Sequence, residues 1–302
     1  MRVLVTGGAG FIGSTIVDAL VARGDTVVAI DDLSTGARAN VATGTPLRVA
    51  DVSDERQLRG ALREEAFDVV VHAASKTKVV ESMEKPDLYR RVIVDGTRNI
   101  VKIADELGVR MLVNLSTGGA IYGETAACAA EDMPVEPTSN YGKYKAEAEK
   151  IVAASRVPSI TLRLANVYGP RQRKDLEGGV VAIFLARWHS GEPLVVFGAG
   201  SAQRDYVFVS DVVDAVVASF AGTWHGVYNI GTGVATSVND LIAALSEILG
   251  RPTGLSHTAA RPAEIERSCV DASKAKRDGL WLPRTTLVDG LRRTAASIGV
   301  RT

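Results

Sequence analysis

The sequence predicts an α/β protein built on a doubly wound parallel sheet. Three observations support this prediction: short apolar strands alternate with helical stretches, the strands are apolar at almost every position, and a glycine-rich turn follows the first strand. Strands that are apolar throughout are typical of a parallel sheet covered by helices on both faces. The alternation of strand and helix predicts right-handed crossovers between neighbouring strands.

The predicted elements divide the chain into two parts. Strands are expected at 2–6, 26–30, 47–50, 68–73, 110–115 and 159–164, with helices at 12–23, 54–65, 86–107 and 140–155. After about residue 166 Gly and Pro become frequent, and we expect helices near 179–190, 210–220, 237–249 and 285–298 and strands near 194–197, 205–208 and 227–230. The predicted sheet domain covers 1–165 plus about 205–230. A smaller, substrate-facing region over 166–204 and 231–302 interleaves with it.

Composition excludes several classes of protein. The chain has 302 residues, of which 46% are hydrophobic, so it can bury a full core. Lys+Arg and Asp+Glu both number 35, which argues against a nucleic-acid partner. No apolar stretch reaches the roughly 18 residues of a membrane span, and the N-terminus does not resemble a signal peptide. We therefore expect a cytoplasmic protein without a membrane partner.

Cysteine and histidine are sparse. The two cysteines, Cys128 and Cys269, lie far apart in the sequence. This spacing predicts a reduced compartment, with neither a disulfide framework nor a metal site. The four histidines lack the close spacing of metal ligands, so we assign no metal.

A glycine-rich turn follows the first predicted strand. Residues 6–13 read TGGAGFIG, which fits GxGxxG and, from Gly7, GxxGxxG. Such glycines allow a pyrophosphate to approach the backbone and the N-terminus of the next helix. Asp31 ends the second strand, 18 residues after Gly13, where a carboxylate binds ribose hydroxyls and repels a 2′-phosphate. The pattern predicts a Rossmann-type domain that binds NAD; the alternative is an ordinary turn at Asp31-Asp32.

A tyrosine and a lysine begin the helix predicted at 140–155. Tyr141 and Lys145 are four residues apart and so share one helix face. A nearby ammonium and the positive nicotinamide ring of NAD favour the phenolate form of a tyrosine, which can then act as a base. Ser116 and Thr117 add two hydroxyls at the end of a strand. The alternative is chance, because this tyrosine–lysine spacing occurs on many surface helices.

Further motifs occur in order along nearly the whole chain. They are HAAS (72–75), STGGAIYG (116–123), LRLANVYGPRQ (162–172), VFGAGSAQRDYVFVSDVVDA (196–215), YNIGTG (228–233) and RPAEIERSCVD (261–271). With these motifs the chain resembles the extended short-chain dehydrogenases/reductases of the NAD-dependent sugar epimerase/dehydratase group. Within that group it is most similar to bacterial UDP-glucose (UDP-galactose) 4-epimerases.

The resemblance implies a role for individual positions. Cofactor contacts are implied for Gly7, Gly10, Phe11, Ile12, Gly13, Asp31, Asp32, Thr35, Gly36, Asp51, Val52, Ala73, Ala74, Ser75, Lys76, Tyr141 and Lys145. Contacts with a UDP-sugar substrate are implied for Lys78, Thr117, Gly118, Tyr141, Asn166, Val180, Val181, Phe197, Arg204 and Arg261. The two arginines would hold the diphosphate, which suits the guanidinium fork.

The resemblance also implies the reaction. Dehydratases and decarboxylases of the group place a carboxylate after the strand-end hydroxyl, whereas this chain has Gly118 and Gly119 there. The missing acid favours C4 epimerisation, in which Tyr141 takes the proton of the 4-hydroxyl, NAD takes the hydride, and both return after the 4-keto sugar turns. Lys145 supports the phenolate. Thr117 is favoured over Ser116 as the hydroxyl that relays the proton.

Several alternatives stay open at this point. Lys78 is either a solvated lysine or a contact to an anionic sugar such as a glucuronate. The substrate is UDP-glucose or, alternatively, UDP-glucuronate or a UDP-N-acetylhexosamine. A nucleotide-4-ketosugar reductase and a non-catalytic NAD-sensing module are the competing classes. The resemblance implies a homodimer through the helices at 86–107 and 140–155. The first of these helices has an apolar stripe, which faces either the partner or the sheet, at Ile100, Ile103, Ala104 and Leu107.

Overall fold

The centre of the protein is a parallel sheet. The structure, a computed structural model, describes residues 1–62, 65–175, 179–250, 252–260 and 265–300. In this part of the chain the main sheet has the strand order β10-β6-β5-β4-β1-β2-β3, and every neighbouring pair is parallel. Its strands are β1 (Arg2–Thr6), β2 (Thr26–Asp31), β3 (Leu47–Val49), β4 (Val69–His72), β5 (Met111–Thr117), β6 (Ser159–Leu164) and β10 (Gly226–Ile230). The predicted doubly wound α/β fold is confirmed.

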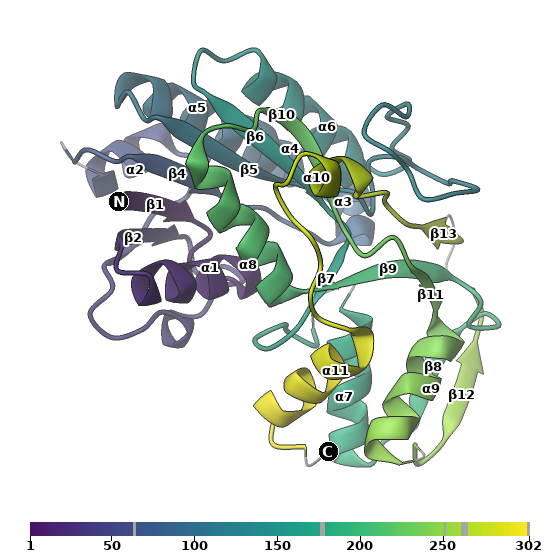
Figure 1. Ribbon diagram of the computed structural model, residues 1–302. Helices are drawn as coiled ribbons and strands as arrows, with labels where there is room; N and C mark the ends of the chain where they lie inside the picture. The colour runs from purple at the N-terminus through teal and green to yellow at the C-terminus, as the bar shows by residue number, and fades with distance from the viewer. Residues whose placement is uncertain (63–64, 176–178, 251, 261–264, 301–302) are drawn as a thin grey trace.

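Helices cover both faces of this sheet (Figure 1). On one face lie α1 (Phe11–Ala22) and α8 (Val209–Ala218). Ile16 of α1 and Val212 of α8 share one buried cluster with Val3 of β1. On the other face lie α2 (Glu55–Leu62), α5 (Gly96–Glu106) and α6 (Asn140–Ala153), whose apolar residues pack with those of the strands. The uniformly apolar strands are therefore buried on both sides, as their sequences predict.

The helical segment predicted at 86–107 has three parts. A helix α4 (Pro86–Arg90) runs into a π-helical turn η2 (Arg91–Asp95) and then into α5. Ahead of it, a short helix α3 (Val79–Glu84) was not predicted. The apolar stripe of α5 faces the sheet, because Ile100 and Ile103 are buried in the cluster that contains Leu4 and Leu112. This stripe is therefore not available to a partner chain.

A smaller lobe lies beside the carboxyl ends of the main strands (Figure 1). One small sheet holds β9 (Gln203–Phe208) between β11 (Ala235–Ser237) and β13 (Arg267–Ser268), with β7 (Asn166–Tyr168) also paired to β9. A second sheet pairs β8 (Leu194–Phe197) with β12 (Leu255–Thr258). The lobe also contains α7 (Val180–Ser190), α9 (Val238–Leu249) and α11 (Leu287–Ser297), which share one core. Short helical turns complete the chain at η1 (Arg38–Asn40), η3 (Ser219–Ala221) and α10 (Ser273–Arg277).

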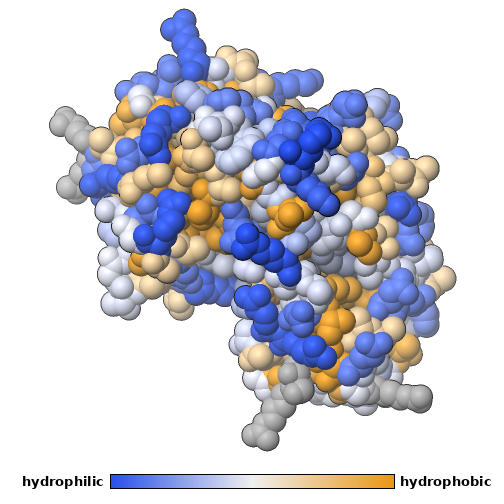
Figure 2. Space-filling model, in the orientation of Figure 1, coloured by the Kyte–Doolittle hydropathy of each residue, from blue (hydrophilic) through white to orange (hydrophobic). Residues whose placement is uncertain are grey.

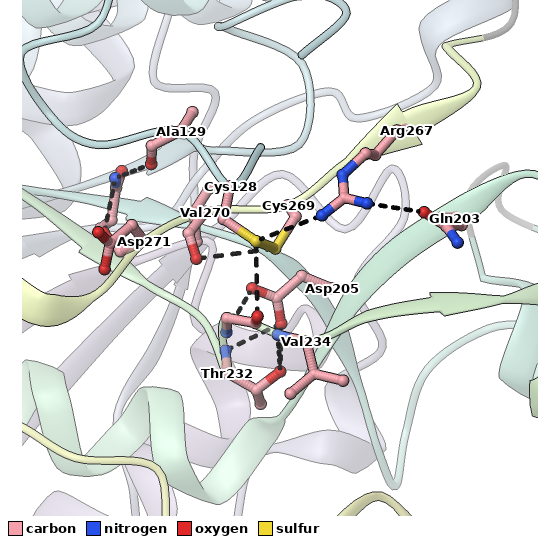
Figure 3. Close-up of a disulfide and its surroundings, with 12 residues drawn as sticks. Cys128, Ala129, Gln203, Asp205, Thr232, Val234, Arg267, Cys269, Val270 and Asp271 are labelled. Atoms are coloured by element: carbon pink, nitrogen blue, oxygen red, sulfur yellow. Dashed lines mark hydrogen bonds between the residues drawn. A yellow bond between two sulfur atoms is a disulfide. The ribbon is translucent and has the colours of Figure 1, made fainter. Parts of the chain in front are cut away.

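The two cysteines form a disulfide, so the expectation of unpaired cysteines was wrong. Cys128 and Cys269 are bonded across a sequence separation of 141 residues. Figure 3 shows the sulfurs between the loop after β5 and the end of β13, with the Arg267 side chain beside them. Backbone hydrogen bonds of Ala129 with Cys269 and Asp271 hold the two segments together. The folded topology, and not proximity in the sequence, brings the cysteines together.

The exposed surface is mixed in polarity (Figure 2). Figure 2 shows hydrophilic residues over most of one face, with apolar residues in small separate patches. Among the described helices, none has the length and apolar character needed to cross a membrane.

Candidate active site

A cleft lies at the carboxyl ends of the main strands. It is centred where β1 lies between β2 and β4, the point at which the chain order of the sheet reverses. Ligands of doubly wound sheets bind at this switch point. Predicted cofactor residues that line the cleft are Gly7, Gly10, Phe11, Ile12, Gly13, Asp31, Asp32, Thr35, Asp51, Val52, Ala73, Ala74, Ser75, Lys76 and Tyr141. The structure thus brings together residues from distant parts of the chain.

The glycine-rich turn fits a dinucleotide because side chains there would collide with the backbone. Gly7 has a φ of +67°, and a Cβ on it would lie 2.8 Å from the Ala74 backbone. A Cβ on Gly13 would lie 2.0 Å from the carbonyl oxygen of Gly7. The chain therefore enters α1 through a turn that only glycine allows, which leaves the first N–H groups of the helix facing the cleft. NAD would sit with its pyrophosphate against this turn.

Asp31 both shapes the turn and faces the cleft. Its carboxylate accepts hydrogen bonds from the backbone N–H of Ala9 and of Leu33, at 3.0 and 2.8 Å. Burial raises the pKa of Asp31, and these N–H donors oppose the rise. Gly36 packs against the same carboxylate, since a Cβ on Gly36 would lie 2.7 Å from its Oδ1. Both interpretations of Asp31 are thus compatible with its position: it closes a turn, and it lines the cleft.

His72, at the end of β4, is a buried histidine that is hydrogen-bonded to neighbouring elements. His72 contacts the Thr6 hydroxyl at 2.8 Å and the Thr97 hydroxyl at 3.1 Å. Burial, together with the positive charge of Lys145, lowers the pKa of His72 to about 3, so its ring is neutral. The Thr6 hydroxyl also accepts a hydrogen bond from the Ala74 N–H. His72 therefore ties β4 to β1 directly under the cleft, a role that the sequence did not reveal.

Of the tyrosine–lysine pair, Tyr141 lines the cleft, whereas Lys145 is buried and is not part of the lining. Ser139 caps α6 by accepting the Gly142 N–H, which fixes the first turn of the helix. The Thr117 side chain lies next to the Tyr141 phenol; burial raises the pKa of Tyr141 to about 12, and the Thr117 hydroxyl opposes the rise. The Lys145 ammonium donates to the carbonyl oxygen of Leu115 at 2.9 Å. Burial lowers the pKa of Lys145 to about 8, and Glu149 opposes that change.

The two strand-end hydroxyls have different partners. Although Ser116 borders the cleft, its hydroxyl donates to the Glu149 carboxylate at 2.5 Å. Glu149 in turn forms a buried ion pair with Arg163, at 2.7 Å between Oε2 and Nη2. Thr117 is the hydroxyl that meets Tyr141. The geometry therefore favours Thr117 as the working hydroxyl.

The remaining predicted substrate residues have varied positions. Asn166 and Thr117 line the cleft. Lys78, Gly118, Val180, Val181, Phe197 and Arg204 are not part of its lining. Of these, Val181 is only 1% exposed in the core of the small lobe, whereas Phe197 is 40% exposed. Arg204 donates to the Gln203 carbonyl oxygen, and Arg261 lies outside the described residues.

The sequence interpretation missed the segment that borders the cleft from the side of the small lobe. Gln172, Arg173 and Gly179 line it, and Arg173 donates to the carbonyl oxygen of Thr35 at 2.9 Å. The Lys76 ammonium, which also lines the cleft, donates to the Ser34 hydroxyl at 2.8 Å. Both cations thus reach the loop after β2. Gln172 ends a motif quoted above, but nothing in its residue types indicated a wall of the cleft.

Comparison with known proteins agrees with this geometry. The model of the NAD-dependent epimerase/dehydratase family matches residues 3–231. A UDP-glucose 4-epimerase of Mycolicibacterium smegmatis is 39% identical, with 97% of each chain covered. The structure of a Thermus thermophilus UDP-glucose 4-epimerase in complex with NAD superposes with a TM-score of 0.93 at 38% identity, and 99% of each chain is covered. A Thermotoga maritima UDP-glucose 4-epimerase structure with UDP-glucose gives 0.94 at 35% identity, again over 99% of each chain.

Proposed function

Because the chain belongs to the NAD-dependent epimerase/dehydratase family, we propose that it epimerises C4 of a UDP-hexose, interconverting UDP-glucose and UDP-galactose, with NAD regenerated in each turnover. The observation that supports this reaction most directly is the contact between Thr117 and Tyr141, with Lys145 one helical turn further along α6. Gly118 and Gly119 follow Thr117, so the segment before Tyr122 has no carboxylate for an elimination.

Tyr141 is the proposed base. When bound, NAD supplies the acceptor and donor of hydride. With a pKa of about 12, the phenol of Tyr141 stays protonated at neutral pH in the protein alone, in which Lys145 is already one turn further along α6. Together with the Lys145 ammonium, an oxidised nicotinamide ring would add the positive charge that favours the phenolate. Tyr141 then accepts the proton of the 4-hydroxyl, while Thr117 holds that hydroxyl in hydrogen-bond reach.

The substrate contacts remain proposals, both inside and outside the cleft. Asn166 lines the cleft next to Ala165 and suits a contact with the sugar or the diphosphate. Arg204 and Arg261 are proposed for the diphosphate, and Val180, Val181, Phe197 and Gly118 for the walls around the nucleotide and sugar. The homodimer, the cytoplasmic location and the division into 1–165 plus 205–230 against 166–204 plus 231–302 also stay predictions. The Cys128–Cys269 disulfide is a feature that reducing compartments seldom maintain.

UDP-glucuronate is the alternative substrate that Lys78 suggests. This residue is the N-cap of α3, and its backbone N–H donates to the Tyr89 hydroxyl at 3.1 Å. Its positive charge contributes to lowering the pKa of Glu81 and of Asp175. The lysine thus already has acidic neighbours within the protein, which favours the solvated reading over a contact with a glucuronate.

The proposed function is tested by product analysis. The purified protein is incubated without added NAD with UDP-glucose, UDP-N-acetylglucosamine or UDP-glucuronate, and the C4 epimers are separated by chromatography. Conversion of UDP-glucose supports the proposal. Conversion of UDP-glucuronate alone keeps the mechanism but replaces the substrate. Dependence on a stoichiometric supply of reduced NAD(P) would contradict epimerisation and indicate a ketosugar reductase.

A further inference from the structure

Three side chains of α6 form one row that leads inward from the cleft. Tyr141, Lys145 and Glu149 are spaced four residues apart, so they lie on one face of the helix. The row presents a phenol, an ammonium and a carboxylate in that order. Tyr141 and Lys145 belong to the proposed chemistry, whereas Glu149 has no part in it so far.

Glu149 is held in place from two neighbouring strands. Its carboxylate accepts the Ser116 hydroxyl from β5, and it accepts Arg163 of β6 at 3.1 Å from Nε and 2.7 Å from Nη2. Arg163 also donates to the Tyr122 hydroxyl, which donates to the Asn229 side chain at 2.8 Å. The Glu149 and Arg163 side chains are only 9% and 7% exposed. All polar groups of this network are satisfied within the protein.

A buried ion pair of this kind is weak support for a purely structural role. Removing two charges from water costs several kcal/mol, and apolar replacements of such pairs are often equally stable. The position of Glu149 supplies another reason for its presence. One turn before it, Lys145 is buried and donates to the Leu115 carbonyl oxygen, directly before Ser116. Because burial disfavours the charged form of a lysine, a nearby negative charge has a strong effect on it.

We propose that Glu149 is a positioning residue of the active site, whose negative charge keeps Lys145 an ammonium ion and whose bond to Ser116 leaves Thr117 alone facing Tyr141. The inference rests on the proposed function for its effect on turnover. The other titratable and charged groups around Lys145 are Tyr141 on its own helix, His72 of β4 and Arg163 of β6. Of these, Tyr141 and His72 are neutral and Arg163 is positive, so Glu149 is the group in this set that favours the charge on Lys145.

The test is the pH profile of turnover in Glu149→Gln. The amide keeps the size of the side chain but removes its charge, so Lys145 loses its proton at lower pH. We expect the alkaline limb of kcat to move down by about one pH unit with little change in KM, so that kcat falls about tenfold near pH 8.5 and little near pH 6.5. Glu147→Gln is the matched control, because Glu147 lies on α6 with its side chain 42% exposed and 3.7 Å from Arg90. An unmoved limb in Glu149→Gln would overturn the proposal, whatever the loss of activity.

Two further measurements keep the test decisive. Arg163→Gln leaves the Glu149 carboxylate without its cation, so the alkaline limb of kcat in this variant should move to higher pH. This result decides the question if Glu149→Gln does not fold. A structural role would give no opposite shifts, and an unmoved limb would again contradict us. If the parent protein epimerises none of the sugars, the proposed function fails, and Glu149 is tested separately by NMR of ¹³C-labelled lysine. The Lys145 signal, assigned by its loss in Lys145→Met, should titrate at lower pH in Glu149→Gln; an equal titration would refute the inference.

Discussion

The side chains of Thr117 and Tyr141 lie next to each other, although Thr117 ends the strand β5 and Tyr141 lies in the first turn of the helix α6. Ser116, the neighbour of Thr117, donates to Glu149 instead. The bond to Glu149 engages the Ser116 hydroxyl, so Thr117 is the hydroxyl left to face the tyrosine. The contact joins the strand-end hydroxyl to the proposed base.

Tyr141→Phe removes the proposed base without removing the ring. We expect turnover to fall by about 10³-fold or more, since general-base catalysis typically contributes 10²–10⁴-fold. The NAD content of the purified variant, measured after denaturation, should equal that of the parent. Appreciable residual epimerisation in Tyr141→Phe would contradict the phenolate role.

Substitutions at Ser116 and Thr117 separate the two hydroxyls. Thr117→Val keeps the shape of the side chain but loses the contact with Tyr141, so kcat should fall by about 10²-fold. Ser116→Ala removes only the donor to Glu149, and its kcat should stay within about threefold of the parent. The measurement is steady-state kinetics of both variants. Equal losses in the two variants would show that the choice of Thr117 is wrong.

Gly13→Ala tests the glycine turn. The added methyl would lie 2.0 Å from the Gly7 carbonyl oxygen, so the turn must open and the purified protein should lose its NAD. Gly60→Ala is the control, because a Cβ at that position of α2 meets nothing within 4 Å. That variant should keep its NAD and gain about 0.5–1 kcal/mol of stability. Full NAD content in Gly13→Ala would disprove the close packing of this turn.

His72 should make the protein sensitive to acid. Its folded pKa of about 3 lies below the unfolded value near 6.5, so the unfolded chain binds the extra proton between these values. Stability is therefore retained above about pH 6.5 and lost as the pH falls below it, by about 2 kcal/mol at pH 5. Urea unfolding of the parent and of His72→Gln, each at about pH 6.5 and about pH 5, measures this loss of stability. If His72→Gln loses as much stability between the two pH values as the parent, another group is responsible.

Reduction of the disulfide should weaken the fold. The bond closes a long loop in the sequence. A disulfide of this kind restricts the unfolded chain and so stabilises the folded state by about 2–4 kcal/mol. Urea unfolding with and without dithiothreitol should show this difference in the parent. The double variant Cys128→Ser with Cys269→Ser should unfold like the reduced parent in both conditions. Identical midpoints for the oxidised and reduced parent would contradict a stabilising disulfide.

The sequence predicted the main sheet and the cofactor turn because both depend on local patterns. Apolar runs fix the strands, and the glycines before α1 precede an acid at the end of β2, Asp31. Contacts between distant segments were not predictable in the same way. The partners of Ser116 depend on how α6 crosses β5 and β6, and the pairing of Cys128 with Cys269 depends on where β13 joins the small lobe. The π-helical turn at Arg91–Asp95 lies inside a continuous helical segment, and no residue of its sequence RVIVD marks a break between α4 and α5.

The disulfide also makes part of the chain a closed ring. The peptide from Cys128 to Cys269, which includes α6 with Tyr141 and Lys145, is joined at its two ends, whereas β1 to β5 with Thr117 lie on the open tail before it. One proteolytic nick within the ring opens the loop but releases no fragment. A nicked molecule would therefore migrate as a single species on a denaturing gel and separate into two pieces only after a reductant is added.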